Sequence, residues 1–319
     1  MNQIKIIKNR SDIGAGTRGS DLGIDAIEIA AINAGNEYFT RFEYTDLETD
    51  NETVYNKVNA LFAKRIEKVR EHCERVSDAV QQSLVDGNFT IVLSGDHSSA
   101  LGTISGVKSA SPNDRIGVVW IDAHADLHSP FTTPSGNVHG MPLAAALNND
   151  NLEYQINEVS ESTQAIWKKL QNVGVNGQKV LPEDLIFFGV RDTEPTEDKI
   201  IEQFNLRNYK VEEIRFRGLN ICLKEALAQL NNCSHIYISF DVDSLDCDMI
   251  SRGTGTPVSK GFDPDEVKAM INNLLDSGKV VCLEVTEVNP LLDTKGNKMA
   301  EAAFEVLDAV TTHFLGSKE

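Results

Sequence analysis

The sequence predicts a three-layer α/β/α fold in which helices cover both faces of a mostly parallel sheet. Short apolar runs along the chain are continuous rather than alternating, as in strands that are buried on both faces. Between them lie longer segments whose apolar residues recur at helical spacing, and this alternation is typical of a parallel sheet with helical crossovers. Polar side chains follow nearly every apolar run, and in such folds ligands bind beyond the carboxyl ends of the strands.

Strands are expected where β-branched, aromatic and other apolar residues dominate a short run, and helices where apolar residues lie three or four positions apart. The expected strands cover residues 3–7, 89–93, 116–121, 185–190, about 209–214, 235–240 and 279–285. The expected helices cover residues 25–35, 53–85 (as one helix or two), 98–109, 141–148, 161–171, 196–206, 219–230, 263–276 and 299–315. No linker, repeat or low-complexity segment interrupts this order, so we expect one domain over residues 1–319.

Local signals mark individual elements. The long helical segment carries apolar residues at helical spacing, among them Val54, Leu61 and Val69, with charged residues between them. Asp86-Gly87-Asn88 ends it, and the strand at 89–93 follows directly. The later strands run straight into polar residues, which places those residues at one edge of a parallel sheet.

The charge balance and the cysteines limit the classes of function and the cellular compartment that fit this chain. The chain has 319 residues, of which 41% are hydrophobic, and a net charge of −18, which disfavours binding to nucleic acid or anionic membranes through bulk electrostatics. No apolar run approaches the ~20 residues of a membrane span, and the N-terminal stretch is too polar for a signal peptide. The five cysteines are scattered, odd in number and without a C-x-x-C motif, which indicates a reducing compartment. A cytoplasmic location is therefore expected.

One glycine-rich stretch has a formal G-x-G-x-x-G pattern at residues 14–19. A dinucleotide site needs this pattern directly after a buried strand, but a polar loop precedes it here. We therefore expect a flexible turn bordering a pocket rather than a dinucleotide site.

Two acidic clusters carry the chemistry. Asp122-x-His124-x-Asp126 follows the strand at 116–121, and Asp241-x-Asp243 follows the strand at 235–240. Alternate residues of extended backbone share a face, so the carboxylates of each cluster point the same way. Crowded carboxylates repel one another and are costly to bury unless something neutralises them. Divalent cations would do so.

His97, at the end of the strand at 89–93, completes the candidate ligand set. The set has two imidazoles, four carboxylates and no thiolate, which suits Mn²⁺, with Fe²⁺ or Co²⁺ as alternatives. Two divalent ions balance four carboxylates and can bind and deprotonate a water molecule. A single such Asp or His would more simply be a turn former, a helix cap or a core residue, but three clusters at successive strand ends favour a binuclear metal site.

Several motifs carry a resemblance to a known family. They are SGDHS at 94–98, DAHADLHSP at 122–130, SGNVHGMP at 135–142, SFDVDSLD at 239–246, GTGTP at 253–257 and EVNP at 287–290. In this order they resemble the motifs of the ureohydrolase superfamily, and within it the arginases, from about residue 12 to the final helix. The resemblance implies a parallel eight-stranded sheet, two Mn²⁺ ions, and hydrolysis of the guanidinium of L-arginine to L-ornithine and urea.

The resemblance also implies roles for single residues. One Mn²⁺ would be held by His97, Asp122, Asp126 and Asp241, and the other by Asp122, His124, Asp241 and Asp243. A hydroxide bridging the metals would attack the guanidinium carbon, and Asp126 would hydrogen-bond it and assist proton transfer to the leaving amine. His139 matches a proton-shuttle histidine, and Glu287 matches the carboxylate that holds the guanidinium, a planar donor fork that pairs well with carboxylate.

The amino-acid end of the substrate is assigned in the same way. The residues implied to contact the substrate away from the metals are His128, Ser135, Asn137, Asp192, Glu194 and Thr256. Two of them depart from the arginase pattern, because His128 stands at an Asn position and Glu194 at an Asp position. Two alternatives stay open: hydrolysis of another guanidino compound (guanidinobutyrate or agmatine), and a non-catalytic member of the fold. The family resemblance further implies a homo-oligomer, a trimer or a hexamer.

Overall fold

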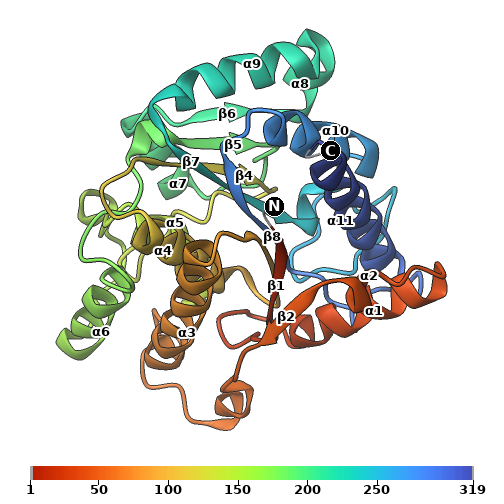
Figure 1. The fold of residues 1–319 in the computed structure, drawn as a ribbon. Helices are drawn as coiled ribbons and strands as arrows, with labels where there is room; N and C mark the ends of the chain where they lie inside the picture. Colours follow the sequence, from red (N-terminus) through yellow and green to blue (C-terminus); the bar gives the residue numbers. More distant parts are fainter. Residues whose placement is uncertain (1–2, 318–319) are drawn as a thin grey trace.

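A computed structural model describes residues 3–317, so residues 1–2 and 318–319 of the expected domain lie outside the described part of the chain. Its strands form one eight-stranded sheet in which all neighbours are parallel, in the order β2-β1-β3-β8-β7-β4-β5-β6 (Figure 1). The strands are β1 Ile4–Asn9, β2 Glu43–Asp46, β3 Phe89–Ser94, β4 Ile116–Ile121, β5 Leu185–Phe188, β6 Arg207–Tyr209, β7 His235–Asp241 and β8 Val280–Thr286. The predicted parallel sheet is confirmed.

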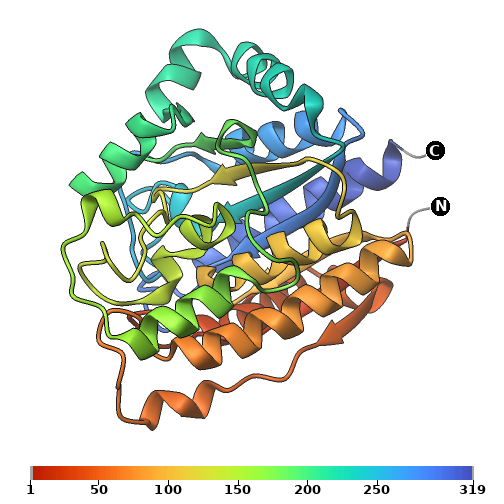
Figure 2. The same ribbon diagram turned by 90° about the vertical axis from the view of Figure 1, so that its left-hand side faces the viewer.

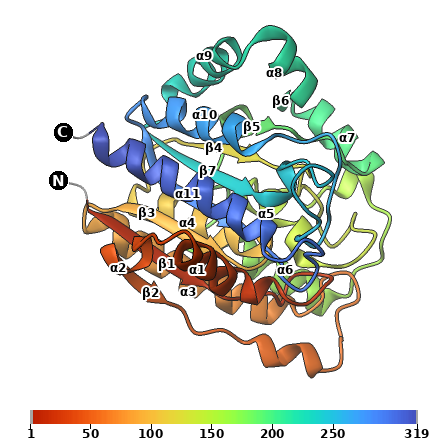
Figure 3. The ribbon, with the colours of Figure 1, turned by 90° about the vertical axis from the view of Figure 1, so that its right-hand side faces the viewer.

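Helices cover both faces of the sheet and give the predicted three layers. They are α1 Gly23–Asn33, α2 Tyr38–Arg41, α3 Ile66–Val85, α4 Ala100–Ala110, α5 Pro142–Ala146, α6 Glu161–Gln171, α7 Pro195–Gln203, α8 Val211–Arg217, α9 Leu219–Gln229, α10 Pro264–Leu275 and α11 Lys298–Gly316. Figure 2 shows the face covered by α3, α4 and α6, and Figure 3 shows the opposite face, where α1, α10 and α11 lie.

Each face of the sheet has its own apolar core. In β4, Val119 and Ile121 pack into the core under α1, α10 and α11, whereas Val118 and Trp120 pack into the core under α3 and α4. Alternate residues of a strand point to opposite faces, so a strand with two cores needs apolar residues at every position. This explains the continuous apolar runs of the sequence.

The strand order places the site. The chain adds β4, β5 and β6 outward on one side and then returns to insert β7 and β8 between β4 and β3. The four central strands are therefore β3, β8, β7 and β4, and these are the strands whose carboxyl ends lead to His97, Glu287, Asp241 and Asp122. Residues that are far apart in the sequence thus meet at one edge.

One predicted strand is wrong in extent and kind. The strand expected at about 209–214 is a short β6, Arg207–Tyr209, followed by helix α8. Alternating residues in this stretch resemble a strand, but Val211 and Ile214 lie three positions apart and are both buried when the stretch is helical. Glu212 and Glu213 occupy the first turn, where the helix dipole favours acids.

The helix expected from residue 53 begins only at Ile66. Residues 51–55 form a 3₁₀ turn and residues 56–65 an irregular segment, and Leu61 within it is 66% exposed. The segment is held by a tertiary contact, since the amide of Lys64 donates to the carbonyl of Gly136, and Arg65 before the helix has a left-handed φ of 58°. Strand β2 and helix α2 were not predicted. β2 is fully exposed and pairs only with β1, so it carries no apolar signal.

Two further observations concern the helices and the cysteines. Within residues 3–317, no helix has the length and apolar character needed to cross a bilayer. All five cysteines are buried and unpaired, as expected for a chain that uses them as small apolar residues.

Candidate active site

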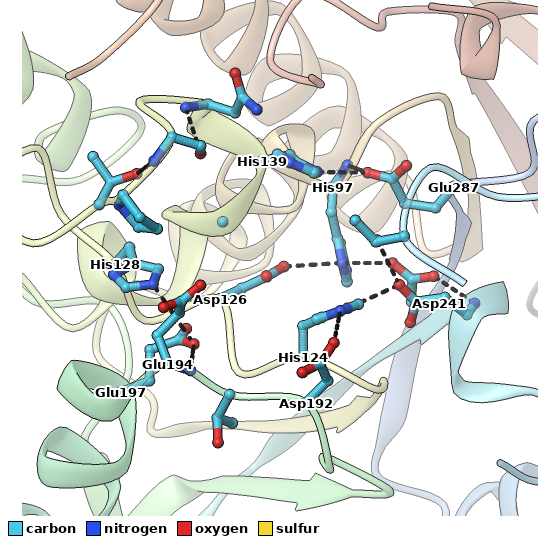
Figure 4. A pocket seen from close by; sticks show the side chains of 18 residues that line it. His97, His124, Asp126, His128, His139, Asp192, Glu194, Glu197, Asp241 and Glu287 are labelled. Carbon is cyan, nitrogen blue, oxygen red and sulfur yellow. Dashed lines mark hydrogen bonds and ion pairs between the residues drawn. The ribbon is translucent and has the colours of Figure 1, made fainter. Parts of the chain in front are cut away.

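The predicted metal ligands converge beyond the carboxyl ends of the central strands, and Figure 4 shows four of them, His97, His124, Asp126 and Asp241. Nδ1 of His97 lies 3.1 Å from Oδ2 of Asp122, 3.2 Å from Oδ2 of Asp126 and 3.1 Å from Oδ2 of Asp241. One imidazole nitrogen thus faces three carboxylates at contact distance. This is the first of the two predicted ligand sets.

The second set lies beside it and shares a carboxylate with it. Nδ1 of His124 lies 2.9 Å from Oδ2 of Asp243 and 3.6 Å from Oδ1 of Asp122. Donor atoms of Asp122, His124 and Asp243 lie within 4.8 Å of one another, and so do those of His97, Asp122 and Asp241. Asp122 therefore stands between two groups that could each hold a cation.

Backbone amides hold these carboxylates in place. Oδ1 of Asp122 accepts from the amide of His124 at 2.7 Å, and Oδ1 of Asp241 accepts from the amide of Asp243 at 2.7 Å. Oδ1 of Asp243 accepts from the amide of Ala123 at 3.1 Å, which ties the end of β7 to the end of β4. In each case the hydrogen bond from the amide to Oδ1 fixes the orientation of the carboxylate in the cluster.

Two site residues adopt left-handed backbone that non-glycine residues avoid. Asp126 has a φ of 50° and Glu287 a φ of 68°. Such a conformation costs roughly 1–2 kcal/mol, and it persists where the surrounding structure over-determines it, most often at functional sites. The amide of Glu287 donates to the carbonyl of Gly95 at 2.9 Å, which anchors the turn that places its carboxylate at the site.

The electrostatics of the cluster favour cations. Burial and the charges of Asp243 and Asp122 hold the pKa of Asp241 well above its usual range, and burial together with the Asp122 charge raises the pKa of Asp126 to about 6. Nδ1 of His97 and Oδ2 of Asp122 are buried without a hydrogen-bond partner among residues 3–317. Buried polar atoms are normally paired, and these two point at the same spot. The donor set therefore fits two divalent cations, and oxygen-rich ligands with imidazole suit Mn²⁺.

A cavity of about 260 Å³ opens onto this cluster. Every predicted site residue lines it except Asp122, which lies buried behind it. On one wall, Oε1 of Glu287 accepts from the amide of His97 at 2.9 Å and lies 3.3 Å from Nδ1 of His139. Nearby, the hydroxyl of Thr256 donates to Oδ2 of Asp243 at 3.1 Å.

The far end of the cavity is acidic on one side. Glu194 is the N-cap of α7 at this end. Asp192, two residues earlier, is exposed and lies nearer the cation cluster, with its Oδ2 3.7 Å from Nε2 of His124. His128 is 7% exposed and faces the same end, with Nε2 3.7 Å from Oε2 of Glu197. Ser135 and Asn137 lie across the mouth, where the hydroxyl of Ser135 accepts from the amide of Asn137 at 3.2 Å.

Glu197 is a cavity residue that the sequence analysis missed. Its carboxylate accepts from the amides of Leu127 and Glu194, both at 3.1 Å, and burial raises its pKa to about 7. In the sequence, the only sign of a role for Glu197 is its spacing from Glu194, with a proline between them. This spacing is typical of a capping box, and the two residues form one at the start of α7. A capping role alone does not bring a carboxylate into a cavity, so the pattern could not reveal the second role.

Comparisons with known proteins agree with this geometry. The family model described as "Arginase family" matches residues 2–312. The arginase of Bacillus subtilis (strain 168) is 31% identical over 309 residues, covering 96% of this chain and 97% of that protein. The arginase of Bacillus caldovelox is 32% identical over 317 residues, covering 97% of this chain and 98% of that protein.

Solved structures show the same relationship. The native structure of the Bacillus caldovelox arginase superposes with a TM-score of 0.80 at 30% identity, covering 97% of this chain and 98% of that one. The Bacillus subtilis arginase gives 0.78 at 31% identity over the same shares of the two chains. The family match spans nearly the whole chain, and the structural match includes the parallel sheet that carries the site. The chain belongs to the arginase family.

Proposed function

We propose that the protein is a manganese-dependent arginase, which hydrolyses the guanidinium group of L-arginine to L-ornithine and urea. The observation that carries the proposal is the cavity, which joins a cluster fit for two cations to an end lined by acids and hydrogen-bond donors. The named relatives are arginases of matching length. Two bound Mn²⁺ ions would supply a water molecule of lowered pKa next to the substrate carbon.

The two observed groups support the proposed ligands, and the place of Asp241 in the second set is implied by the family resemblance. We assign His97, Asp122, Asp126 and Asp241 to one ion and Asp122, His124, Asp241 and Asp243 to the other. Thr256 holds Asp243 in place through its hydroxyl. A hydrogen bond of this kind orients a ligating carboxylate, so Thr256 serves the site even without touching an ion.

Glu287 is the proposed partner of the substrate guanidinium. Its Oε1 is taken by the amide of His97 and by His139, so Oε2 is the oxygen left for the substrate. Hydrogen bonds to His139 and His97 outweigh burial and lower the pKa of Glu287, so it is ionised at neutral pH. A charged carboxylate is what a guanidinium fork pairs with best.

Asp126 and His139 are the proposed proton carriers. Asp126 lies beside the cation cluster, where a carboxylate can hydrogen-bond a metal-activated water molecule and take up its proton. His139 gives Nδ1 to Glu287 and is about one-fifth exposed, so Nε2 can exchange a proton with solvent or with the leaving amine. Burial lowers the pKa of His139, but hydrogen bonding to Glu287 outweighs this and raises it.

His139→Asn is expected to reduce turnover by about 10²-fold, less than the loss of Asp126, because solvent can partly replace a shuttle. His139 contributes only in its protonated form. Its raised pKa keeps that form populated to a higher pH than in an ordinary histidine, and the form is lost as the pH rises further. The ratio of wild-type to variant kcat should therefore shrink toward alkaline pH. If the kcat of His139→Asn equalled that of wild type from neutral to alkaline pH, the shuttle role would be wrong.

The other end of the cavity has the charges of an amino-acid site. Glu194 and Glu197 lie on the side suited to an ammonium group, with Asp192 at the rim. His128, Ser135 and Asn137 offer hydrogen-bond donors suited to a carboxylate. Agmatine lacks the carboxylate and guanidinobutyrate lacks the amino group, so each would leave part of this end unpaired.

His128→Asn is expected to change the KM for arginine several-fold with kcat little altered, because His128 lies away from the cation cluster and reaches only the amino-acid end of the cavity. Steady-state kinetics with added Mn²⁺ separates the two parameters. An effect confined to kcat would contradict this assignment and place His128 in the chemistry.

Urea release from arginine, agmatine and guanidinobutyrate, each with added Mn²⁺, tests the proposed function. The expected result is a kcat/KM highest for arginine. Faster hydrolysis of either of the others would favour a ureohydrolase of different specificity. A protein that binds no Mn²⁺ and hydrolyses none of the three would be a non-catalytic member of the fold.

We further propose that residues 1–319 form a single domain that acts in the cytoplasm as a homo-oligomer, a trimer or a hexamer. The single sheet, the five buried thiols and the family membership support this proposal. Light scattering coupled to size exclusion measures the oligomer mass directly.

A further inference from the structure

The end of the cavity proposed for the amino-acid part of the substrate has to bind a carboxylate close to acidic side chains. Glu194 and Glu197 line this end, and within residues 3–317 no lysine or arginine lines the cavity. A substrate carboxylate therefore depends on hydrogen-bond donors, among them the side-chain amide of Asn137. An amide binds a carboxylate only when its N–H groups face it, so whatever orients Asn137 affects how well the carboxylate is bound.

Lys64 is in contact with this amide from outside the cavity. Its Nζ donates to Oδ1 of Asn137 at 3.1 Å, and the lysine side chain is half-buried. Within the described chain, no other lysine or arginine hydrogen-bonds to a side chain that lines the cavity. Lys64 also forms no ion pair among residues 3–317, so this amide oxygen is the partner of its Nζ.

The hydrogen bond from Lys64 determines which way the Asn137 amide faces. A lysine ammonium has three donors and no acceptor, so it requires the amide oxygen on its side. Nδ2 of Asn137 lies on the other side, against the exposed backbone of Gly16, where a Cβ would come within 2.5 Å of it. Nδ2 donates to no group among residues 3–317, so its N–H groups are available to a substrate carboxylate.

Backbone contacts hold Lys64 beside the loop that carries Asn137. The amide of Lys64 donates to the carbonyl of Gly136 at 2.8 Å. Gly136 has a left-handed φ of 74°, and a Cβ there would overlap the carbonyl oxygen of Leu61, so the close approach of the two segments requires glycine. These main-chain contacts place the side chains of Lys64 and Asn137 next to each other, and a change of the Lys64 side chain leaves its amide hydrogen bond available.

We propose that Lys64 is a positioning residue that determines specificity, because it holds the Asn137 amide with its N–H donors toward the carboxylate of the substrate. The inference rests on the proposed function, since it applies to a substrate whose far end carries a carboxylate. An ammonium on the amide oxygen also polarises the amide and strengthens its N–H groups as donors. Lys64 therefore favours arginine over agmatine, which has no carboxylate to accept these hydrogen bonds.

Lys64→Met removes the donor and keeps a side chain of similar length. With Mn²⁺ added, kcat/KM for arginine is expected to fall about tenfold, as for a lost hydrogen bond to a charged group. The loss should lie in KM, and the inhibition constant of agmatine against arginine should be unchanged. Lys64→Arg restores a charged donor and should recover most of the loss. An unchanged KM for arginine, or equal losses for arginine and agmatine, would overturn the inference.

Lys168→Met is the matched control. Nζ of Lys168 donates to Oδ1 of Asn148 at 3.0 Å, and neither residue lines the cavity. The same chemical change there should leave the KM for arginine at the wild-type value. A loss in Lys168→Met as large as that in Lys64→Met would show that the effect does not come from the contact with Asn137.

A double-mutant cycle tests whether Lys64 acts through Asn137. Once Asn137→Ala has removed the amide, adding Lys64→Met should change kcat/KM for arginine little further, because the two residues act as one unit. Additive losses would overturn the inference. Asn137→Ala alone decides the matter if Lys64→Met does not fold, since a wild-type KM in that variant would leave Lys64 nothing to position. A wild-type protein that does not hydrolyse arginine would overturn the proposed function as well.

Discussion

Asp126→Asn is expected to lower the turnover of arginine by about 10³-fold and to leave the fold intact. Asp126 lies 3.2 Å from His97 in the cation cluster and is the proposed proton acceptor, and an amide can neither accept that proton nor supply the charge. The backbone should tolerate the change, because asparagine is among the few residues that readily adopt the left-handed φ of 50° found here. The measurement is kcat at saturating arginine and Mn²⁺, with circular dichroism to verify the fold.

Asp265→Asn is the matched control for this experiment. Its carboxylate is 88% exposed on α10 and pairs with Lys268 at the surface, so the same chemical change there should leave kcat at the wild-type value. If Asp126→Asn kept more than about a tenth of wild-type turnover with its metal bound, Asp126 could not be the proton acceptor.

Asp241→Asn is expected to abolish the stabilisation that Mn²⁺ gives to the folded protein. A ligand that binds only the folded state at a hundred times its Kd adds about 2.7 kcal/mol to the free energy of unfolding. Asp241 is 2% exposed and belongs to the first ligand set, so its neutral replacement should weaken Mn²⁺ binding severely. Thermal unfolding with and without Mn²⁺ measures the effect, and metal analysis of the purified protein checks it.

The metal-free form of Asp241→Asn should be at least as stable as metal-free wild type. The change removes one of several crowded carboxylates, and the asparagine oxygen can still accept from the amide of Asp243. Asp184→Asn is the control: Asp184 is fully buried but pairs with Arg115, so this variant should be less stable yet gain as much from Mn²⁺ as wild type. A wild-type gain from Mn²⁺ in Asp241→Asn would contradict the assigned ligand set.

Much of the fold was predictable because strands buried on both faces must be apolar throughout. β4 shows this, since its alternate residues enter two different cores. The errors lie in segments to which this rule does not apply, because they are not strands buried on both faces. The short helix α8 follows a short edge strand and has an ambiguous pattern, and β2 is an exposed strand whose four residues form no apolar run. Residues 56–65 leave the helical path because Lys64 bonds to Gly136, a contact that no local pattern contains.

The candidate site was predictable to a similar degree. Asp122, His124, Asp241 and Asp243 are recognisable as polar residues with a period of two at the ends of apolar runs. Glu197 was missed because its spacing from Glu194 already has a local explanation as a capping box. Its approach to His128 arises only when α7 packs beside the loop after β4.

The amino-acid sequence by itself determined the parallel sheet, the residue types at its carboxyl edge, and the chemistry of which those types are capable. These are local properties, set by periodicity and side-chain composition. Only the tertiary structure decided that β8 and β7 lie between β3 and β4, and thus that His97, Asp122 and Asp241 share a cation site. It also decided that Nε2 of His97, which follows β3, lies 2.7 Å from the hydroxyl oxygen of Ser239 in β7. Some of these contacts join residues more than a hundred positions apart, such as His97 and Asp241, and their positions follow from how helices and strands pack together rather than from any short pattern.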